Sequence, residues 1–430
     1  MEVSGITLLR SWGARGSLAV LDQATTSGCN FLLNVLLARW MEPAAYGAFA
    51  VGFTLFLFVS GYHNALLLEP MSVLGPGRHR PRLPEYLLAQ VRLHVLLTSL
   101  LGVLLLPAAA FFWWGHRSGP LAEAILGTSL ALPMILFLWV VRRFFYILGS
   151  PSRALAGSVL YLLLSLGGLF TIKSLGSVNP LSALLVMGFS SLLAGGAVFP
   201  LTHLSGAARG SETPLRMLDI LREHWIFGRW IVLAAALISA STQLQTLFCA
   251  ALLGLEAAGA LRAMQIVMLP MAQVITAVAT LALPQLSHEH AGGHLRSLRS
   301  RGIMLTLALS GLAAVYEVVL LMTSRPLEAA LYGGRMAAYS WLIPVFGLVP
   351  VFTALSTGYS LILRAAEKPQ HFLIVGSVTA PLSVVSGIVF TRVWGLAGTS
   401  ASIVLASAVT AVVTYCICQA WVPGPPRRAV

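Results

Sequence analysis

The sequence is poor in charged residues, and this scarcity excludes an ordinary soluble domain. Only 10% of its 430 residues are Asp, Glu, Lys or Arg, whereas soluble domains carry about 25%. Hydrophobic residues make up 57% of the chain and lie in long apolar runs. The composition therefore predicts an all-α polytopic membrane protein.

Motifs that carry chemistry are also scarce. The sequence has no GxxxxGK[ST] loop for a nucleotide phosphate, and no paired carboxylates in a loop that could form an active site. The four cysteines lie inside apolar runs, which gives no disulfide framework. Nothing near His288, His290 and His294 completes a tetrahedral zinc site, so we expect a solvated loop there. We predict no enzyme, no cofactor and no bound metal.

Basic residues outnumber acidic ones, and the formal net charge is +13. They are scattered among short loops and form no basic domain, which argues against nucleic acid as a partner. If the N-terminus is cytoplasmic, all but seven of the 27 Lys and Arg residues fall on the cytoplasmic side. The seven are Arg39, Arg117, Lys173, Arg262, Arg325, Arg335 and Arg392. The positive-inside rule therefore predicts that both termini are cytoplasmic.

Twelve apolar segments are candidate membrane helices, and Pro or Gly marks most of the breaks. They cover approximately 18–38, 44–68, 87–113, 121–148, 154–174, 180–203, 230–253, 257–285, 302–323, 339–363, 371–391 and 396–420. The longest connections, 69–86 and 204–229, are too short for a soluble domain. We expect an N-terminal six-helix lobe over 1–210 and a C-terminal six-helix lobe over 211–430.

The first candidate helix carries a polar stripe. Gln23, Ser27, Asn30 and Asn34 fall within about 60° of one another at helical spacing. Amides facing lipid would be costly, so the stripe should face other helices or a water-filled cavity.

The same pattern returns 212 positions later, which indicates an internal duplication. Ser239, Thr242, Thr246 and Gly259 then align with Ser27, Asn30, Asn34 and Gly47. Two parallel halves are an architecture known among transporters.

Other polar and ionisable residues lie inside apolar runs, and such residues are candidates for functional sites. Asp22 either snorkels to the membrane surface or binds a coupling cation or a substrate group. Glu317 is either a structural acid or a proton site. His63 and Asn64 either form hydrogen bonds between helices or have a functional role. The eighth helix carries a polar face that we expect to line a cavity. It consists of Arg262, Gln265, Gln273, Thr276 and Thr280.

The segment ARWMEPAAYGAFAV (38–51) resembles the junction between the first two helices of the oligosaccharide-lipid (Wzx-type) flippases. These belong to the multidrug/oligosaccharidyl-lipid/polysaccharide exporter superfamily. Arg39, Pro43, Tyr46 and Gly47 match that junction, whereas Glu42 replaces the usual glycine. LLGLEAAGALRA (252–263) resembles its counterpart in the second lobe.

The resemblance implies two V-shaped six-helix lobes around a central cavity and transport by alternating access. It also implies a substrate of sugars on a polyprenyl diphosphate, flipped to the outer leaflet for exopolysaccharide, capsule or O-antigen synthesis. The place would be the bacterial cytoplasmic (inner) membrane. Membrane lipids, a polysaccharide polymerase and export machinery are the expected partners.

Such a substrate needs cations for its diphosphate and polar groups for its sugars. Arginine suits a diphosphate because its planar guanidinium group can donate two parallel hydrogen bonds to phosphate oxygens. The candidates are Arg39, Arg92 and Arg262, and the alternative for Arg39 and Arg92 is that they snorkel at the interface. The polar candidates are Gln23, Asn30, Asn34, Thr242, Gln243, Thr246, Gln265 and Gln273, and the candidates for ion coupling are Asp22 and Glu317.

Three other functions stay open at this point. A cation-coupled multidrug antiporter of the same superfamily would need a buried acid, and Asp22 could supply it. A membrane glycosyltransferase or polymerase usually needs a large outer loop, and the expected outer loops are all short. A major facilitator would carry its Gly-x-x-x-Asp-Arg-x-Gly-Arg loop within 69–86, where this motif is absent.

Overall fold

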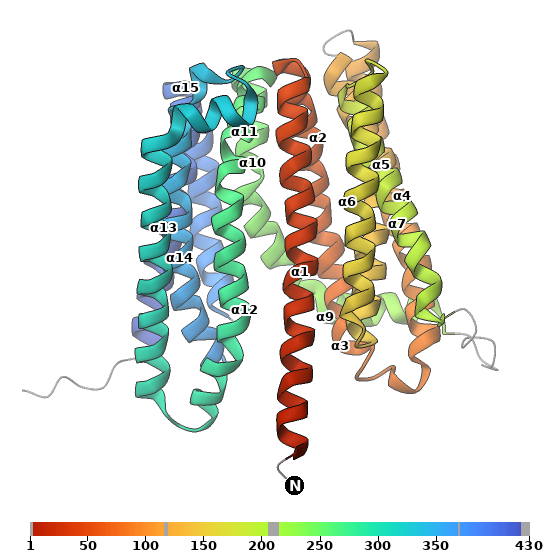
Figure 1. The fold of residues 1–430 in the computed structure, drawn as a ribbon, viewed down its shortest axis with the longest axis vertical. Helices are drawn as coiled ribbons and strands as arrows, with labels where there is room; N and C mark the ends of the chain where they lie inside the picture. Colours follow the sequence, from red (N-terminus) through yellow and green to blue (C-terminus); the bar gives the residue numbers. More distant parts are fainter. Residues whose placement is uncertain (1–2, 116–118, 205–214, 369, 423–430) are drawn as a thin grey trace, which may run out of the picture. The chain divides into compact units, whose positions relative to one another are not determined.

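The computed structural model describes residues 3–115, 119–204, 215–368 and 370–422. Within these ranges the ordered elements are all helices and no strand occurs (Figure 1). The chain forms two compact units, Met1–Ala236 and Leu237–Val430. The division falls inside helix α9 (Met217–Thr242), which therefore contributes to both units. Part of the predicted loop 204–229, residues 205–214, lies outside the described residues.

The first unit is a bundle in which α5 is central and packs against α2, α4 and α7. Prolines occupy the first turn of α2, α6 and α7, where the missing N–H costs nothing. Its elements are α1 (Val3–Trp40), α2 (Pro43–His63), the π-helix η1 (Asn64–Leu68), α3 (Glu69–Leu74), η2 (Arg80–Arg82), α4 (Leu83–Trp114), α5 (Gly119–Ile147), α6 (Pro151–Ser174), α7 (Pro180–Val198) and η3 (Phe199–Thr202).

The second unit is built around α14, which packs against α12, α13 and α15. Its elements after α9 are α10 (Leu244–Leu253), α11 (Leu255–Gln265), η5 (Ile266–Met268), α12 (Leu269–Ala291), α13 (Leu295–Tyr332), η6 (Ala337–Tyr339), α14 (Leu342–Ala365) and α15 (His371–Trp421). Gly358 of α14 lies directly against the Thr306 side chain of α13. Small residues at such contacts let membrane helices approach closely.

The described part of the chain contains ten helices long and apolar enough to cross a membrane. The last of them, α15, has 51 residues and breaks at Gly395, whose φ of 58° and ψ of −136° are not helical. Each part of α15 is long enough to span a bilayer. Helix α1 is not among the ten; it has 38 residues and carries the predicted polar stripe. The predicted fold class is thus confirmed: an all-helical polytopic membrane protein with about twelve membrane helices.

Candidate substrate site in the second unit

A polar cavity of about 290 Å³ lies within the second unit. The α9–α10 and α11–η5 segments contribute its amide and guanidinium groups, and α12, α14 and α15 contribute apolar side chains together with three hydroxyl groups. Five of the sequence-predicted residues line it together: Thr242, Gln243, Thr246, Arg262 and Gln265. Both polar segments interrupt their helices at the cavity, and each interruption has a physical cause.

The first interruption separates α9 from α10 at Gln243. The Ser241 carbonyl at this break accepts a hydrogen bond of 2.9 Å from the Ser383 hydroxyl of α15. The side-chain amide of Gln245, two residues after Gln243, donates to the Ser383 carbonyl (2.7 Å) and to the Ser402 hydroxyl (3.1 Å). These hydrogen bonds hold the break in place, because backbone groups left without hydrogen bonds would be costly in a membrane.

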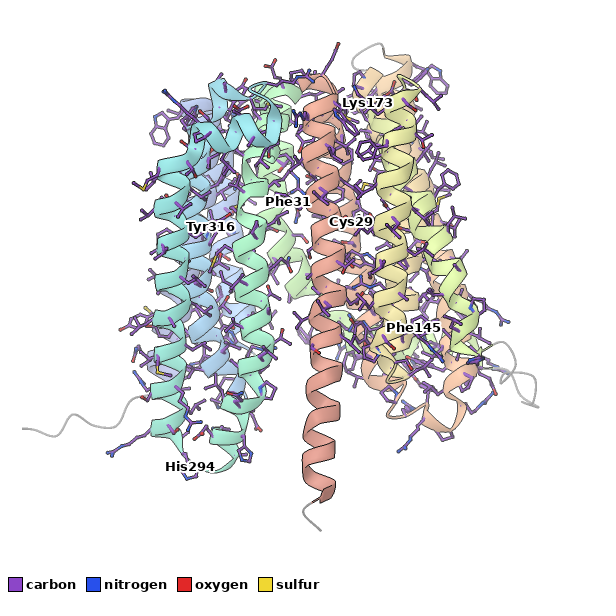
Figure 2. All side chains as sticks on the ribbon, in the orientation of Figure 1. Cys29, Phe31, Phe145, Lys173, His294 and Tyr316 are labelled. Carbon is purple, nitrogen blue, oxygen red and sulfur yellow. The ribbon has the colours of Figure 1, made fainter. Side chains whose placement is uncertain are left out.

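The second interruption is the single 3-10 turn η5, which joins α11 to α12. Pro270 follows it and cannot donate a helical hydrogen bond. Two tyrosines of α13 bond to carbonyls of this region: Tyr316 (Figure 2) donates to Val267 and Tyr332 donates to Ala263, both at 2.6 Å. A packed α13 thus stabilises a non-α-helical turn beside the cavity.

A second cavity of about 230 Å³ shares three wall residues with the first, Ser241, Thr242 and Thr410. It extends to Ser360 and His371. The His371 Nδ1 lies 2.8 Å from the Lys368 carbonyl and must donate to it, so in the neutral ring Nε2 accepts from the Ser360 hydroxyl at 2.8 Å. The two cavities therefore adjoin at three hydroxyl residues, and further hydroxyl groups line both of them.

This arrangement suits a ligand that is both anionic and polyhydroxylated. Arg262 is partly buried and can donate several hydrogen bonds to an anion in fixed geometry. The amides of Gln243 and Gln265 can donate to and accept from hydroxyl groups. Thr242 already donates to the Ile238 carbonyl at 2.9 Å, so its oxygen is oriented as an acceptor.

The polar face expected along the eighth helix is not continuous, because η5 divides it. A 3-10 turn advances about 120° per residue in place of 100°, which changes the phase of the residues that follow. Gln273 is partly exposed and is not among the cavity residues. Thr276 and Thr280 are exposed and donate to carbonyls of their own helix.

The predicted stripe of the first unit has a different environment. Gln23 is exposed, whereas Asn34 is buried and donates to the Asn30 carbonyl at 2.8 Å. Asn30 lines a cavity of about 20 Å³ with Arg142 and Tyr161, which is room for about one water molecule. The space that Asn30 lines within its own unit is therefore too small for a sugar.

The other two predicted cations, Arg39 and Arg92, are exposed. Neither lies in a cavity described in the first unit. Their exposure fits the snorkelling alternative as well as substrate binding, and both roles stay predictions.

Asp22 does not snorkel, and this alternative was wrong. Its side chain is fully buried, and the Arg142 guanidinium donates to its Oδ2 at 2.7 Å. The hydroxyls of Tyr146 and Ser158 donate to the same carboxylate, and Thr26 donates to Ser158 at 3.1 Å. The aspartate thus joins α1 to α5 and α6, and its predicted role in ion coupling stays a prediction.

Glu317 is the other candidate for ion coupling. It lies on α13, its side chain is 7% exposed, and it packs against Gly347 of α14, whose missing side chain leaves room for the carboxylate. Its Oε2 has no hydrogen-bond partner among the described residues. Both the structural role and the proton role fit this position.

Some cavity residues were not singled out from the sequence. Thr353, Ser407 and Thr410 line the first cavity, and His371 lines the second. Isolated hydroxyl residues are common in membrane helices, because they bond to their own backbone. The pattern that could have indicated Ser407 and Thr410 is their helical spacing of three, followed by a helical spacing of four to Thr414.

No protein-family model matches the sequence, and no curated protein matches it. Solved structures do match in fold. One is an inward-facing multidrug resistance MATE family transporter of the MOP superfamily, with a TM-score of 0.70, 16% identity, and 94% of this chain and 98% of that chain covered.

Two further structures have the same architecture. An outward-facing MATE family transporter of that superfamily gives a TM-score of 0.61 at 15% identity, with 95% of each chain covered. The lipid II flippase MurJ, in an inward closed conformation, gives 0.72 at 13% identity, with 94% of this chain and 87% of that chain covered. The chain therefore has the fold of the MOP superfamily transporters.

Proposed function

We propose that the protein is a membrane transporter that flips a polyprenyl-diphosphate-linked oligosaccharide from the cytoplasmic to the outer leaflet. The observation that carries this proposal is the cavity of the second unit, where Arg262, Gln265 and Thr242 meet at two helix interruptions. Discontinuous helices of this kind form substrate sites in many transporters. A polar cavity inside a lipid-embedded unit has to be filled by water or a polar ligand.

Each part of the substrate has a matching group in the proposal. Arg262 binds the diphosphate, whose oxygens accept charge-assisted hydrogen bonds. The amides and hydroxyls of the first cavity, and the hydroxyls that continue into the second, bind the sugars. The polyprenyl chain stays in the bilayer, because its transfer into a polar cavity would cost about 0.8 kcal/mol per CH₂ group.

The fold supports this choice in two ways. Solved relatives in fold include one described as a lipid II flippase, and others are described in inward-facing and outward-facing conformations. We propose the same alternating access here, in the inner membrane of a bacterium, with both termini cytoplasmic. A polysaccharide polymerase and export machinery would then use the flipped lipid for exopolysaccharide, capsule or O-antigen synthesis.

The experiment is a deletion strain in which lipid-linked oligosaccharide is located by leaflet. We expect the lipid-linked sugar to be made in full and to accumulate on the cytoplasmic leaflet, with restoration by a plasmid copy of the gene. Absence of the lipid-linked sugar itself would contradict the proposal and indicate an enzyme. Normal leaflet distribution together with new drug sensitivity would contradict it too, and would indicate the multidrug antiporter.

A further inference from the structure

The last residue of helix α2 is a histidine that forms a buried pair with a histidine of α4, and the proposed substrate site uses neither of them. His63 is the last residue of α2 and is 3% exposed, and His94 of α4 is 1% exposed. The two rings meet edge to face with centroids 5.2 Å apart. His63 Nε2 lies 3.1 Å from His94 Nδ1, so the pair is joined by one hydrogen bond.

The surroundings determine which ring nitrogens carry hydrogen. His94 Nε2 lies 3.1 Å from the Pro133 carbonyl, which can only accept, so Nε2 of His94 is protonated. In the neutral ring His94 Nδ1 is then an acceptor, and His63 Nε2 donates to it. His63 Nδ1 therefore presents a lone pair, and this buried atom has no hydrogen-bond partner among the described residues.

No described carboxylate lies within hydrogen-bond reach of either ring. Helix α5 offers the Pro133 carbonyl and the Phe137 ring to His94, and neither group carries a charge. Nearby charged groups on the same helices are engaged elsewhere or exposed. Glu69 accepts from Asn64 at 3.4 Å, and Arg92 is exposed.

The chain changes its helical form directly after His63. Residues Asn64–Leu68 form the π-helix η1, a rare form that often occurs at functional positions. His224 of α9 bonds to the Leu66 carbonyl within this turn at 2.9 Å and, on its other nitrogen, to the Tyr86 hydroxyl at 2.7 Å. The π-turn is thus held by one histidine from α9 and begins beside another.

We propose that His63 Nδ1 is the site that binds the coupling proton of transport, and that His94 positions the His63 ring. This inference rests on the proposed transport function. The Nδ1 lone pair takes the proton from hydronium, so one N–H bond forms while one O–H bond breaks and leaves water, and release reverses this exchange. An imidazolium here has no acid to pair with, so protonation favours a conformation in which the π-turn rearranges and the ring reaches water.

The first test needs no transport substrate. The purified protein, labelled with ¹⁵N-histidine and placed in lipid vesicles, is titrated by NMR. We expect protonation at His63 Nδ1 and a coupled change of the His94 signal in the wild type, loss of that change of the His94 signal in His63→Gln, and a shifted His63 midpoint in His94→Gln. His288→Gln, at an exposed histidine of α12, is the matched control and should leave the pair unchanged. A wild-type His63 Nδ1 signal that does not change with pH, or a His94 signal that titrates unchanged in His63→Gln, would overturn the assignment.

The second test follows flipping of a lipid-linked oligosaccharide in proteoliposomes with an imposed pH gradient. We expect the gradient to accelerate flipping by the wild type and by His288→Gln, and we expect this acceleration to be lost in His63→Gln. His63→Asn serves as a second variant if the glutamine variant does not fold. Acceleration of either folded His63 variant to the wild-type extent would refute the proposal. If the wild type flips nothing, the proposed function fails, and the NMR titration still decides the proton site.

Discussion

The ion pair between Asp22 and Arg142 allows a quantitative test of what the buried aspartate does. The change is Asp22→Asn, which keeps the shape and removes the negative charge. The carboxylate is fully buried, and the Arg142 side chain is 12% exposed with its Nη2 2.7 Å from Oδ2. In the variant, the guanidinium would remain largely buried without its counter-charge.

The expected cost follows from that geometry. Removing one partner of a buried ion pair destabilises proteins by about 3–5 kcal/mol. The asparagine oxygen can still accept from Tyr146 or Ser158, so we expect the lower end, ~3 kcal/mol. Arg142→Gln should cost a similar amount. The double variant should cost less than the sum of the two, with a coupling free energy of about 1–3 kcal/mol.

The assay is unfolding of the purified protein in detergent, by heat and by denaturant, for both single variants and the double variant. Glu367→Gln, at an exposed acid, is the matched control and should change stability by no more than about 0.5 kcal/mol. Transport per folded molecule is measured alongside. Unchanged stability of Asp22→Asn would refute the structural role, and a loss of transport at that unchanged stability would instead support ion coupling.

Two other predictions concern packing and topology. Gly358→Leu should lower the free energy of unfolding by about 1–3 kcal/mol, because the new side chain would overlap α13. Gly311→Leu, which has open space beside the glycine, is the control and should have little effect. Equal thermal stability of the two variants would contradict the close approach of α13 and α14. Cysteines introduced in 69–86 and 286–301 should not react with an impermeant thiol reagent in intact cells, because the arginine bias predicts that both segments are cytoplasmic. Ready labelling of both segments would contradict this orientation and indicate the opposite one.

Much of the fold could be predicted because the bilayer imposes long apolar runs, and Pro and Gly end them. The kink at Gly395 is one example, since this glycine lies in the expected gap between the last two helices. The helix interruptions could not be predicted in the same way. The π-turn after His63 and the 3-10 turn after Gln265 depend on bonds from His224 and Tyr316, which lie far away in the sequence.

The candidate site was predictable to a different extent in the two units. The spacing of Thr242 and Thr246 and the polar start of the eighth helix indicated a polar wall, and these residues line the cavity with Arg262. The partner of Asp22 was not predictable, because Arg142 is 120 positions away and helical spacing says nothing about contacts between helices. Sequence periodicity gives the face of a helix, and only packing decides what that face meets.

The central claim is that Arg262 binds the diphosphate of a lipid-linked sugar. The most direct measurement is flipping of a fluorescent polyprenyl-diphosphate oligosaccharide in proteoliposomes, with Arg262→Ala, Arg262→Lys and the exposed-residue control Arg325→Ala reconstituted at equal protein levels. Loss of charge-assisted hydrogen bonds worth about 1.5–3 kcal/mol predicts flipping about 10- to 100-fold slower in Arg262→Ala. Partial recovery is expected in Arg262→Lys, which keeps the charge without the bidentate fork, and no change in Arg325→Ala. Flipping by Arg262→Ala at the wild-type rate would contradict the account.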